Sequence, residues 1–335
     1  MLKRIDEKKV ERVVAPKGTT CYQFDSKMGF WGIPNISLET SNEYKPGESI
    51  QICHNSLGNR DCNVIISGNK LNIICLGGSH TWGGGVPQDI RYTEYLSSMS
   101  GQQIFNMGHC SLGLDQICLA ILHKSSIYSP NIIVVEQYPW AVHRVLNSYV
   151  NGFIRPHFVL NKQGNLELRK VPSFAGNKII RKIIGSYYSY RKELIEFKAG
   201  LNIKQNYDSE HDPIFLMWKT RHYDAMYVLV DKILEVMIGY CRQRNIKLVF
   251  CLGAVMQQLS FASQSNLIDY LLPRDRLVEC LNNHDIPYID MTASMMAGHI
   301  PNDPVIFPDG HINQKGHYIF AKTLHKDLLD RGWIN

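Results

Sequence analysis

The sequence predicts an α/β protein built on a parallel sheet. Short runs such as residues 72–77 (NIICLG) and 131–136 (NIIVVE) are apolar throughout, which is typical of strands covered on both faces. Stretches with apolar residues at helical spacing alternate with these runs, as in proteins with βαβ units. With 44% hydrophobic and 20% charged residues over 335 positions, the chain has ordinary globular composition. This composition excludes a disordered chain, a collagen-like chain and a coiled coil.

Five strands and five helices are expected in alternation. The strands are expected at residues 72–77, 104–106, 131–136, 247–252 and 287–289. The helices are expected at residues 92–99, 114–128, 223–244, 266–283 and 315–330. The second helix shows the pattern well, because apolar residues recur at Leu114, Ile117, Cys118, Ile121 and Leu122.

Two segments do not follow this alternation. Residues 1–70 contain turn-rich pieces and no long helical pattern, so we expect an N-terminal extension of short strands and turns. Residues 71–335 would form the main domain, interrupted by an insertion at about 150–218. Within the insertion, residues 161–165 (NKQGN) predict a hairpin turn between extended runs. A basic amphipathic piece follows at residues 178–198.

The positive charge is concentrated in one region. The chain has 36 Lys and Arg residues against 30 Asp and Glu residues, and residues 141–218 alone hold 12 basic and 6 acidic residues. No zinc-finger spacing, basic heptad region or aromatic RNA-binding signature is present, so no nucleic-acid partner is expected. The basic piece at 178–198 is either a solvated helix face or a peripheral contact with a membrane or another anion. Within it, Lys178, Arg181 and Lys182 are candidate contacts for an anionic substrate.

The compartment expected from the sequence is the cytoplasm. No segment approaches the roughly 18 consecutive apolar residues of a membrane span. Residues 1–12 are charged throughout and lack an apolar signal core. The nine cysteines are scattered and odd in number, which fits reduced thiols better than a disulfide framework.

A glycine cluster directly after the first strand marks the first candidate site. Residues 77–85 read GGSHTWGGG, but no G-x-G-x-x-G register fits and no P-loop lysine follows. The G-x-S-x-G elbow also fails, because Thr81 occupies its last position. What remains is Ser79 at the carboxyl end of a buried strand, the edge where open α/β sheets carry their sites. Ser79 is either a helix N-cap or a nucleophile that a histidine activates.

Two further clusters supply partners for such a serine. Asp309 precedes His311 by two residues in a loop before the last helix, where a carboxylate can orient an imidazole. The alternative is that Asp309 and His311 only stabilise the loop. Gly108 follows the second strand, and a glycine there leaves its N–H open to a ligand oxygen.

A metal site is a further alternative at this sheet edge. His80, His109 and His311 all belong to the three clusters. No H-E-x-x-H or Cys-x-x-Cys spacing supports a metal, so none is expected. His317 falls at the start of the last helix and is expected to be structural. Cys75 and Cys110 are expected to be small buried hydrophobic residues, with Cys110 near a pocket.

Taken in order, the three clusters resemble the SGNH (GDSL-like) hydrolase superfamily. The matching stretches are residues 55–61, 77–86, 106–108 and 309–317. The resemblance covers roughly residues 50–137 and 246–330 and implies a flavodoxin-like three-layer sandwich. It also implies that Ser79 is the nucleophile, His311 the base and Asp309 its orienting carboxylate. The N–H groups of Ser79 and Gly108 would hold the oxyanion.

The sequence departs from the family pattern at two points. Gly78 stands where the family has an Asp before the serine, and no Asn follows the third strand, where the family has an oxyanion donor. Gln137 is the candidate replacement, since its carboxamide offers the same N–H donor on a longer arm. The alternative is that Gln137 bonds the backbone at the sheet edge.

The expected function is hydrolysis of an acyl ester, on a sugar or another small metabolite, through an acyl-serine intermediate. No cofactor is implied, and the partner is a small-molecule or glycan ester substrate. Two alternatives remain open. The same Ser-His-Asp site could transfer the acyl group to a carbohydrate hydroxyl, or the fold could be a catalytically silent binding protein.

Overall fold

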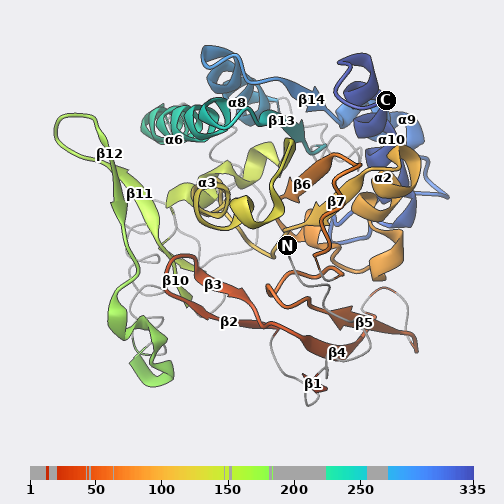
Figure 1. Cartoon of the computed structure of the whole chain (residues 1–335), viewed down its shortest axis with the longest axis horizontal. Helices are drawn as coiled ribbons and strands as arrows, with labels where there is room; N and C mark the ends of the chain where they lie inside the picture. The colour runs from red at the N-terminus through yellow and green to blue at the C-terminus, as the bar shows by residue number, and fades with distance from the viewer. Residues whose placement is uncertain are drawn as a thin grey trace.

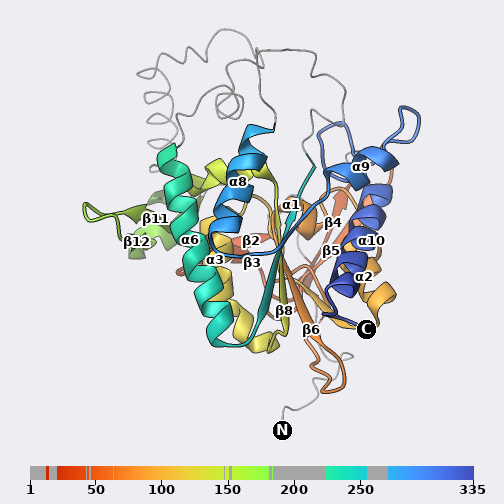
Figure 2. The same ribbon diagram turned by 90° about the horizontal axis from the view of Figure 1, so that it is seen from above.

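A computed structural model (Figure 1) describes most of the chain. The described residues are 13–14, 21–42, 44, 47–62, 64–146, 148–150, 153–180, 183, 224–254 and 271–335. A central sheet with helices on both faces makes up the main body (Figure 2).

The central sheet is parallel and has five strands. Along the chain they are β6 (Asn72–Leu76), β7 (Gln103–Asn106), β8 (Ile132–Gln137), β13 (Lys247–Leu252) and β14 (Tyr288–Asp290). Their order in the sheet is β14-β13-β8-β6-β7, and every neighbouring pair is parallel. Counted by chain position this is the flavodoxin-like order 2-1-3-4-5. The predicted fold class, a three-layer α/β sandwich, is therefore confirmed.

Helices cover the two faces of this sheet in two groups (Figure 2). One face carries α3 (Leu114–Lys124), α6 (Asp224–Gln243) and α8 (Leu272–Asn283). The other carries α2 (Tyr92–Ser100), α9 (Thr292–Gly298) and α10 (Gln314–Asp330). Shorter turns are α1 (Ser79–Trp82), η2 (Gln88–Ile90), η3 (Ser125–Tyr128) and η4 (Pro139–Leu146).

Alternate side chains of the strands fill two cores. Ile74 and Val135 pack with the α3 and α6 layer, whereas Ile73 and Val134 pack with the α2 and α10 layer. Because successive side chains point to opposite faces, strands covered on both sides must be apolar at every position. All five residues of β6 and all six of β8 are buried. This burial accounts for the continuous apolar runs seen in the sequence.

Each predicted helix has a counterpart in the structure, with differences at the ends. The helix expected at 114–128 ends as an α-helix at Lys124 and continues as the 3₁₀ turn η3. The helix expected at 266–283 is described from Leu272, and residues 255–270 lie outside the described part of the chain. None of the helices in the described ranges is long and apolar enough to cross a bilayer.

Short strands precede the main sheet. They are β1 (Val13–Val14), β2 (Tyr22–Asp25), β3 (Gly29–Gly32), β4 (Ile36–Ser41) and β5 (Ser49–Cys53). β2 pairs with β3 and β4 with β5, both antiparallel, while β1 runs parallel to β4. Met28 and Phe30 are fully buried and belong to the same core cluster as Ile117 on α3. The division of the chain at residue 70 stays a prediction.

The segment after β8 leaves the alternation of strands and helices. It contains β9 (Tyr149–Val150), β10 (Phe153–Ile154), β11 (His157–Leu160), β12 (Leu166–Arg169) and η5 (Ser173–Gly176). β11 and β12 form an antiparallel hairpin whose turn lies at the expected residues, with Gly164 at φ +78°. Figure 1 shows this hairpin projecting beside α6. Most of the basic piece at 178–198 lies outside the described residues.

Candidate active site

Ser79, His311 and Asp309 form a continuous hydrogen-bonded chain. Ser79 opens α1 directly after β6, and the two other residues lie in the loop before α10. Nε2 of His311 is 2.7 Å from Oγ of Ser79, and Nδ1 of His311 is 2.7 Å from Oδ2 of Asp309. The backbone N–H of His311 also donates to Asp309 Oδ1 at 3.1 Å. The structure therefore brings together the three residues that the sequence suggested, across 232 positions of chain.

A tyrosine from the segment between β4 and β5 joins this chain. The hydroxyl of Tyr44 donates to Oδ2 of Asp309, and its ring stacks on Phe307 with centroids 4.0 Å apart. Partial burial opposes ionisation of Asp309, but the hydrogen bonds from Tyr44 and His311 outweigh it and hold its pKa below the usual value. Tyr44 was not predicted from the sequence, because 265 residues separate it from Asp309 and no local pattern marks it.

The imidazole of His311 also has a packed neighbour. His80 is buried and lies between two rings, 4.0 Å from the centroid of Tyr138 and 4.9 Å from that of His311. Burial, and then the positive charge that His311 can carry, keep the pKa of His80 well below its ordinary value. Because His80 is neutral, it adds no positive charge next to His311 when His311 accepts a proton as the base.

Glycines allow the turn that carries Ser79 to pack closely against neighbouring side chains. Gly83 ends α1 at φ +87°, and a Cβ there would lie 2.5 Å from the side chain of Arg91. A Cβ on Gly77 would lie 2.3 Å from both Glu136 Oε2 and Thr81 Oγ1. The glycine cluster thus serves backbone conformation and close packing rather than a phosphate loop.

Glu136 anchors the turn that carries Ser79 through hydrogen bonds. Its Oε2 accepts hydrogen bonds from the Gly78 N–H at 3.0 Å and from the Thr81 hydroxyl at 2.9 Å. The carboxyl is buried, and this desolvation raises its pKa despite the two hydrogen bonds. One sign of this role is visible in the sequence, an acidic residue inside an otherwise apolar strand.

A cavity of about 290 Å³ lies beside Ser79. Its walls include Cys110, Leu112, Gln137, Trp140 and Arg144, in addition to the Ser-His-Asp residues. Burial raises the pKa of the Cys110 thiol, which keeps it in its protonated form. The cavity is therefore lined by the Ser79 hydroxyl, by apolar side chains and by the Arg144 side chain.

In addition to the Ser79 N–H, the sequence suggested two oxyanion donors, and both of them already make hydrogen bonds. The Gly108 N–H donates to Asn106 Oδ1 at 2.9 Å, and Gly108 is not among the cavity-lining residues. Gln137 does line the cavity, but its Nε2 donates to the Tyr138 carbonyl at 2.8 Å. A carboxamide carries two N–H bonds, so one of them remains after this contact. The oxyanion roles of both residues stay predictions, and for Gly108 the role requires exchange of the present bond for one to substrate.

The predicted substrate contacts are only partly described. Lys178 is exposed and does not line the cavity beside Ser79. Arg181 and Lys182 lie outside the described residues. Their role in attracting an anionic substrate remains a prediction.

The histidines His80 and His109, which were considered as metal ligands, pack against other rings instead. His109 is fully buried, with its ring 3.9 Å from that of Trp31 and its Nε2 3.2 Å from Asn59 Oδ1. His80 is packed between two rings. Over the part of the chain that the structure describes, no group of three or more His, Cys, Asp or Glu residues has a metal-binding arrangement.

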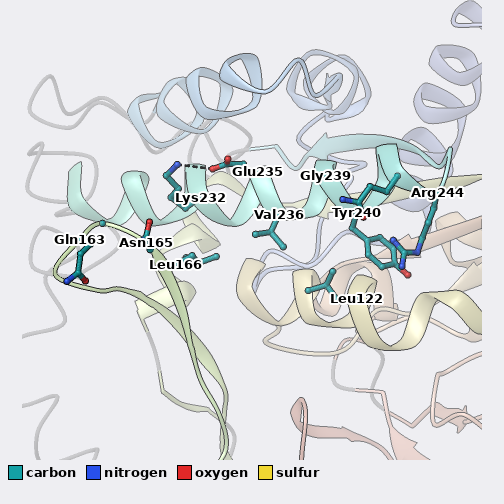
Figure 3. Close-up of a pocket in the computed structure, with 12 residues that line it drawn as sticks. Leu122, Gln163, Asn165, Leu166, Lys232, Glu235, Val236, Gly239, Tyr240 and Arg244 are labelled. Carbon is teal, nitrogen blue, oxygen red and sulfur yellow. Dashed lines mark hydrogen bonds and ion pairs between the residues drawn. The ribbon is translucent and has the colours of Figure 1, made fainter.

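A second and larger hollow lies away from these residues. It has a volume of about 850 Å³ and is formed between the β11–β12 turn and α6 (Figure 3). Gln163 and Asn165 lie on the hairpin side, and Lys232, Glu235 and Tyr240 on the α6 side. The Ser-His-Asp residues do not line this hollow, so any chemistry of the serine belongs to the smaller cavity.

Comparison with known proteins finds similarity at the level of solved structures. No family model and no curated protein matches the chain. A lipolytic protein of the G-D-S-L family from Veillonella parvula covers 76% of this chain and 97% of its own, at 12% identity and TM-score 0.40. An acetyl xylan esterase covers 77% and 100%, at 12% identity and TM-score 0.44. A lipase/acylhydrolase from Enterococcus faecalis covers 78% and 96%, at 12% identity and TM-score 0.42.

Proposed function

We propose that the chain is a serine ester hydrolase that acts through an acyl-serine intermediate. The observation that carries the proposal is the Ser79–His311–Asp309 chain, in which both links are 2.7 Å long and all three residues line a cavity. A hydroxyl is a weak nucleophile alone, and a base within hydrogen-bond reach that is itself oriented by a carboxylate activates it.

The geometry supports a two-stage reaction. His311 Nε2 accepts the Ser79 proton as Oγ attacks the ester carbonyl carbon, and the protonated imidazole then gives that proton to the leaving alcohol. Water, deprotonated by the same nitrogen, hydrolyses the acyl-serine and restores the free hydroxyl. Asp309 fixes the Nδ1–H tautomer and stabilises the imidazolium. The Ser79 N–H, at the first position of α1 where helix N–H groups lack internal partners, is available for the oxyanion.

The substrate that we propose is a small acyl ester, on a sugar or another small metabolite. The limited cavity volume supports a short acyl group. We also propose a reducing compartment, the cytoplasm, which is supported by the nine cysteines, none of which forms a disulfide.

Labelling and kinetics test the proposal together. A fluorophosphonate should label the wild-type protein at Ser79, and Ser79→Ala should abolish the label. Ser79→Ala and His311→Ala should each remove most turnover of an aryl acetate, and the double variant should be little worse than either, because the residues act as a unit. Near wild-type turnover by Ser79→Ala would refute the assignment.

The same measurements separate the alternatives. Labelling without turnover in water, followed by turnover when a sugar acceptor is supplied, would identify an acyltransferase. A folded protein that is neither labelled nor active would be a binding protein.

A further inference from the structure

We propose that Arg144 makes the cavity beside Ser79 a binding site for an ester that carries a carboxylate. This inference rests on the proposed ester hydrolysis and names the class of substrate for it. Arg144 lies on η4, in the segment that follows β8, and lines the cavity together with Ser79 and His311.

The guanidinium of Arg144 is next to the nucleophile. A Cβ built on Gly78, the residue before Ser79, would lie 3.4 Å from Nη1 of Arg144. That distance is ordinary van der Waals contact, so the glycine leaves a small space between the serine turn and the guanidinium. The space has room for one carbon atom, so a carboxylate of a bound ester would reach the guanidinium from the cavity that Gly78 and Arg144 both line.

The partners of Arg144 differ from those of Arg91 and Arg155, two arginines that are buried and paired with carboxylates. Arg91 pairs with Glu94 at 2.7 Å, and Arg155 pairs with Asp115. Within the described ranges, Arg144 has no carboxylate within ion-pair distance, and its one hydrogen bond is from Nη1 to the Leu112 carbonyl at 3.3 Å. Its remaining N–H groups are therefore free to bind a ligand.

Glu136 is the acidic group that acts on Arg144 most directly. Burial lowers the pKa of Arg144, and the charge of Glu136 opposes this effect. Glu136 also lines the cavity, but no direct ion pair joins it to Arg144, and its Oε2 accepts from the Gly78 N–H and the Thr81 hydroxyl. A half-buried cation with only a distant counter-charge is less stable than a paired one, and a carboxylate of the substrate offsets that cost.

The position of the guanidinium is fixed by packing. Its central carbon lies 5.3 Å from the ring centroid of Trp140, a cation–π distance. Ala141, Val142 and Val145 of the same turn are buried, which anchors η4 to the core. A guanidinium held in place loses little freedom on binding, and its planar fork suits a carboxylate with two parallel hydrogen bonds.

The carboxylate can belong to either side of the ester. Mono-4-nitrophenyl succinate carries it on the acyl group, and 4-acetoxybenzoate carries it on the alcohol. 4-Nitrophenyl acetate is the neutral reference. Arg144→Gln should lower kcat/KM for one of the two anionic esters by roughly 10- to 100-fold, mainly through KM, and change the neutral ester by less than about 3-fold. The anionic ester that responds identifies the side.

Two further variants sharpen the test. Arg144→Lys keeps the charge but loses the fork, so it should recover only part of the preference. Gly78→Asp places a carboxylate against the guanidinium while Arg144 is retained. It should therefore abolish the preference for the anionic ester. Arg169→Gln, an exposed arginine on β12, is the matched control and should leave the ratio unchanged.

The outcomes separate this inference from the proposed function. If wild type hydrolyses none of the three esters and Ser79 is not labelled, the proposed function fails. If wild type is active and Arg144→Gln lowers all three esters equally, Arg144 acts on the reaction centre or on the fold and the carboxylate site is refuted. If Arg144→Gln does not fold, competitive inhibition of wild type by succinate, lost in Gly78→Asp, supports the site, and absence of inhibition overturns it.

Discussion

Four residues from three parts of the chain meet at the nucleophile. Ser79 follows β6, His311 and Asp309 precede α10, and Tyr44 comes from the region between β4 and β5. Asp309 thus accepts hydrogen bonds from both His311 and Tyr44. A carboxylate with two donors is held more firmly than one with a single donor, which matters for a residue whose role is orientation.

Tyr44→Phe removes one of these donors and keeps the ring on Phe307. We expect kcat for an aryl ester to fall by about 2- to 10-fold at nearly constant KM, because the bond to Asp309 is partly exposed and worth less than a buried one. Tyr95→Phe, which removes a hydroxyl on α2 that accepts from Gln314 and not from the Ser-His-Asp residues, is the control. Equal kinetics for Tyr44→Phe and wild type would leave Tyr44 without a role in orientation.

The second residue-scale prediction concerns Glu136. Its pKa is raised in the folded protein above about 4.3, the value of an unperturbed glutamate. The folded state therefore binds more protons, and this contribution to stability is present at low pH and is lost as pH rises through the folded pKa. In Glu136→Gln this decline should disappear, while the amide oxygen can still accept from the Gly78 N–H.

Urea unfolding of wild type and Glu136→Gln between pH 4 and pH 9 measures this difference. The free energy of unfolding of the variant, relative to wild type, should increase with pH. A constant difference across the range would mean that Glu136 does not change its proton binding on folding.

Among the elements, the short turn α1 depends on an arginine from outside the sheet. Arg60 is buried and donates to the carbonyls of Gly83 at 2.6 Å, Val86 at 2.8 Å and Trp82 at 3.3 Å. A helix of four residues cannot satisfy its own last carbonyls. The guanidinium does so, and it also lies over the Trp82 ring at 4.6 Å.

Arg60→Met should destabilise the protein by about 2–4 kcal/mol, since each orphaned buried acceptor costs about 1–3 kcal/mol. Arg169→Met, at an exposed ion pair, should cost less than about 1 kcal/mol. Denaturant unfolding of both variants checks the contrast. A similar loss of unfolding free energy in the two variants would show that water replaces Arg60 as the donor to the three carbonyls.

The elements were more predictable than their contacts. Strands such as β6 and β8 are apolar at every position because both faces are covered, so the sequence alone locates them. Ser79 and His311 were found because each lies beside a strand or helix end that the pattern predicts. Tyr44 and Arg144 were missed, because their roles depend on distances across the fold that no local spacing encodes.

At the scale of the whole molecule, the N-terminal strands share the core of the main sheet. Phe30 contacts Tyr22 and Phe153 through its ring, and all three belong to the core cluster that includes Ile74 of the sheet. A shared core favours unfolding as one unit. The residue pattern separated the N-terminal part by its turns, but turns do not report which core their strands join.

Phe30→Ala should therefore lower the stability of the whole protein by about 3–5 kcal/mol, as for other buried phenylalanines. Far-UV circular dichroism and tryptophan fluorescence should still give one coincident transition in urea. Two separate transitions, with only the first shifted, would show that the N-terminal strands unfold by themselves.

The thiol in the cavity wall has a consequence for covalent inhibitors. The wall includes a thiol, Sγ of Cys110, in addition to Oγ of Ser79. Because burial raises the pKa of Cys110, its sulfur stays protonated at neutral pH and reacts slowly with maleimides and iodoacetamide. A compound designed for this cavity can therefore carry a serine-directed warhead and place an apolar group against the sulfur, without a competing thiol adduct.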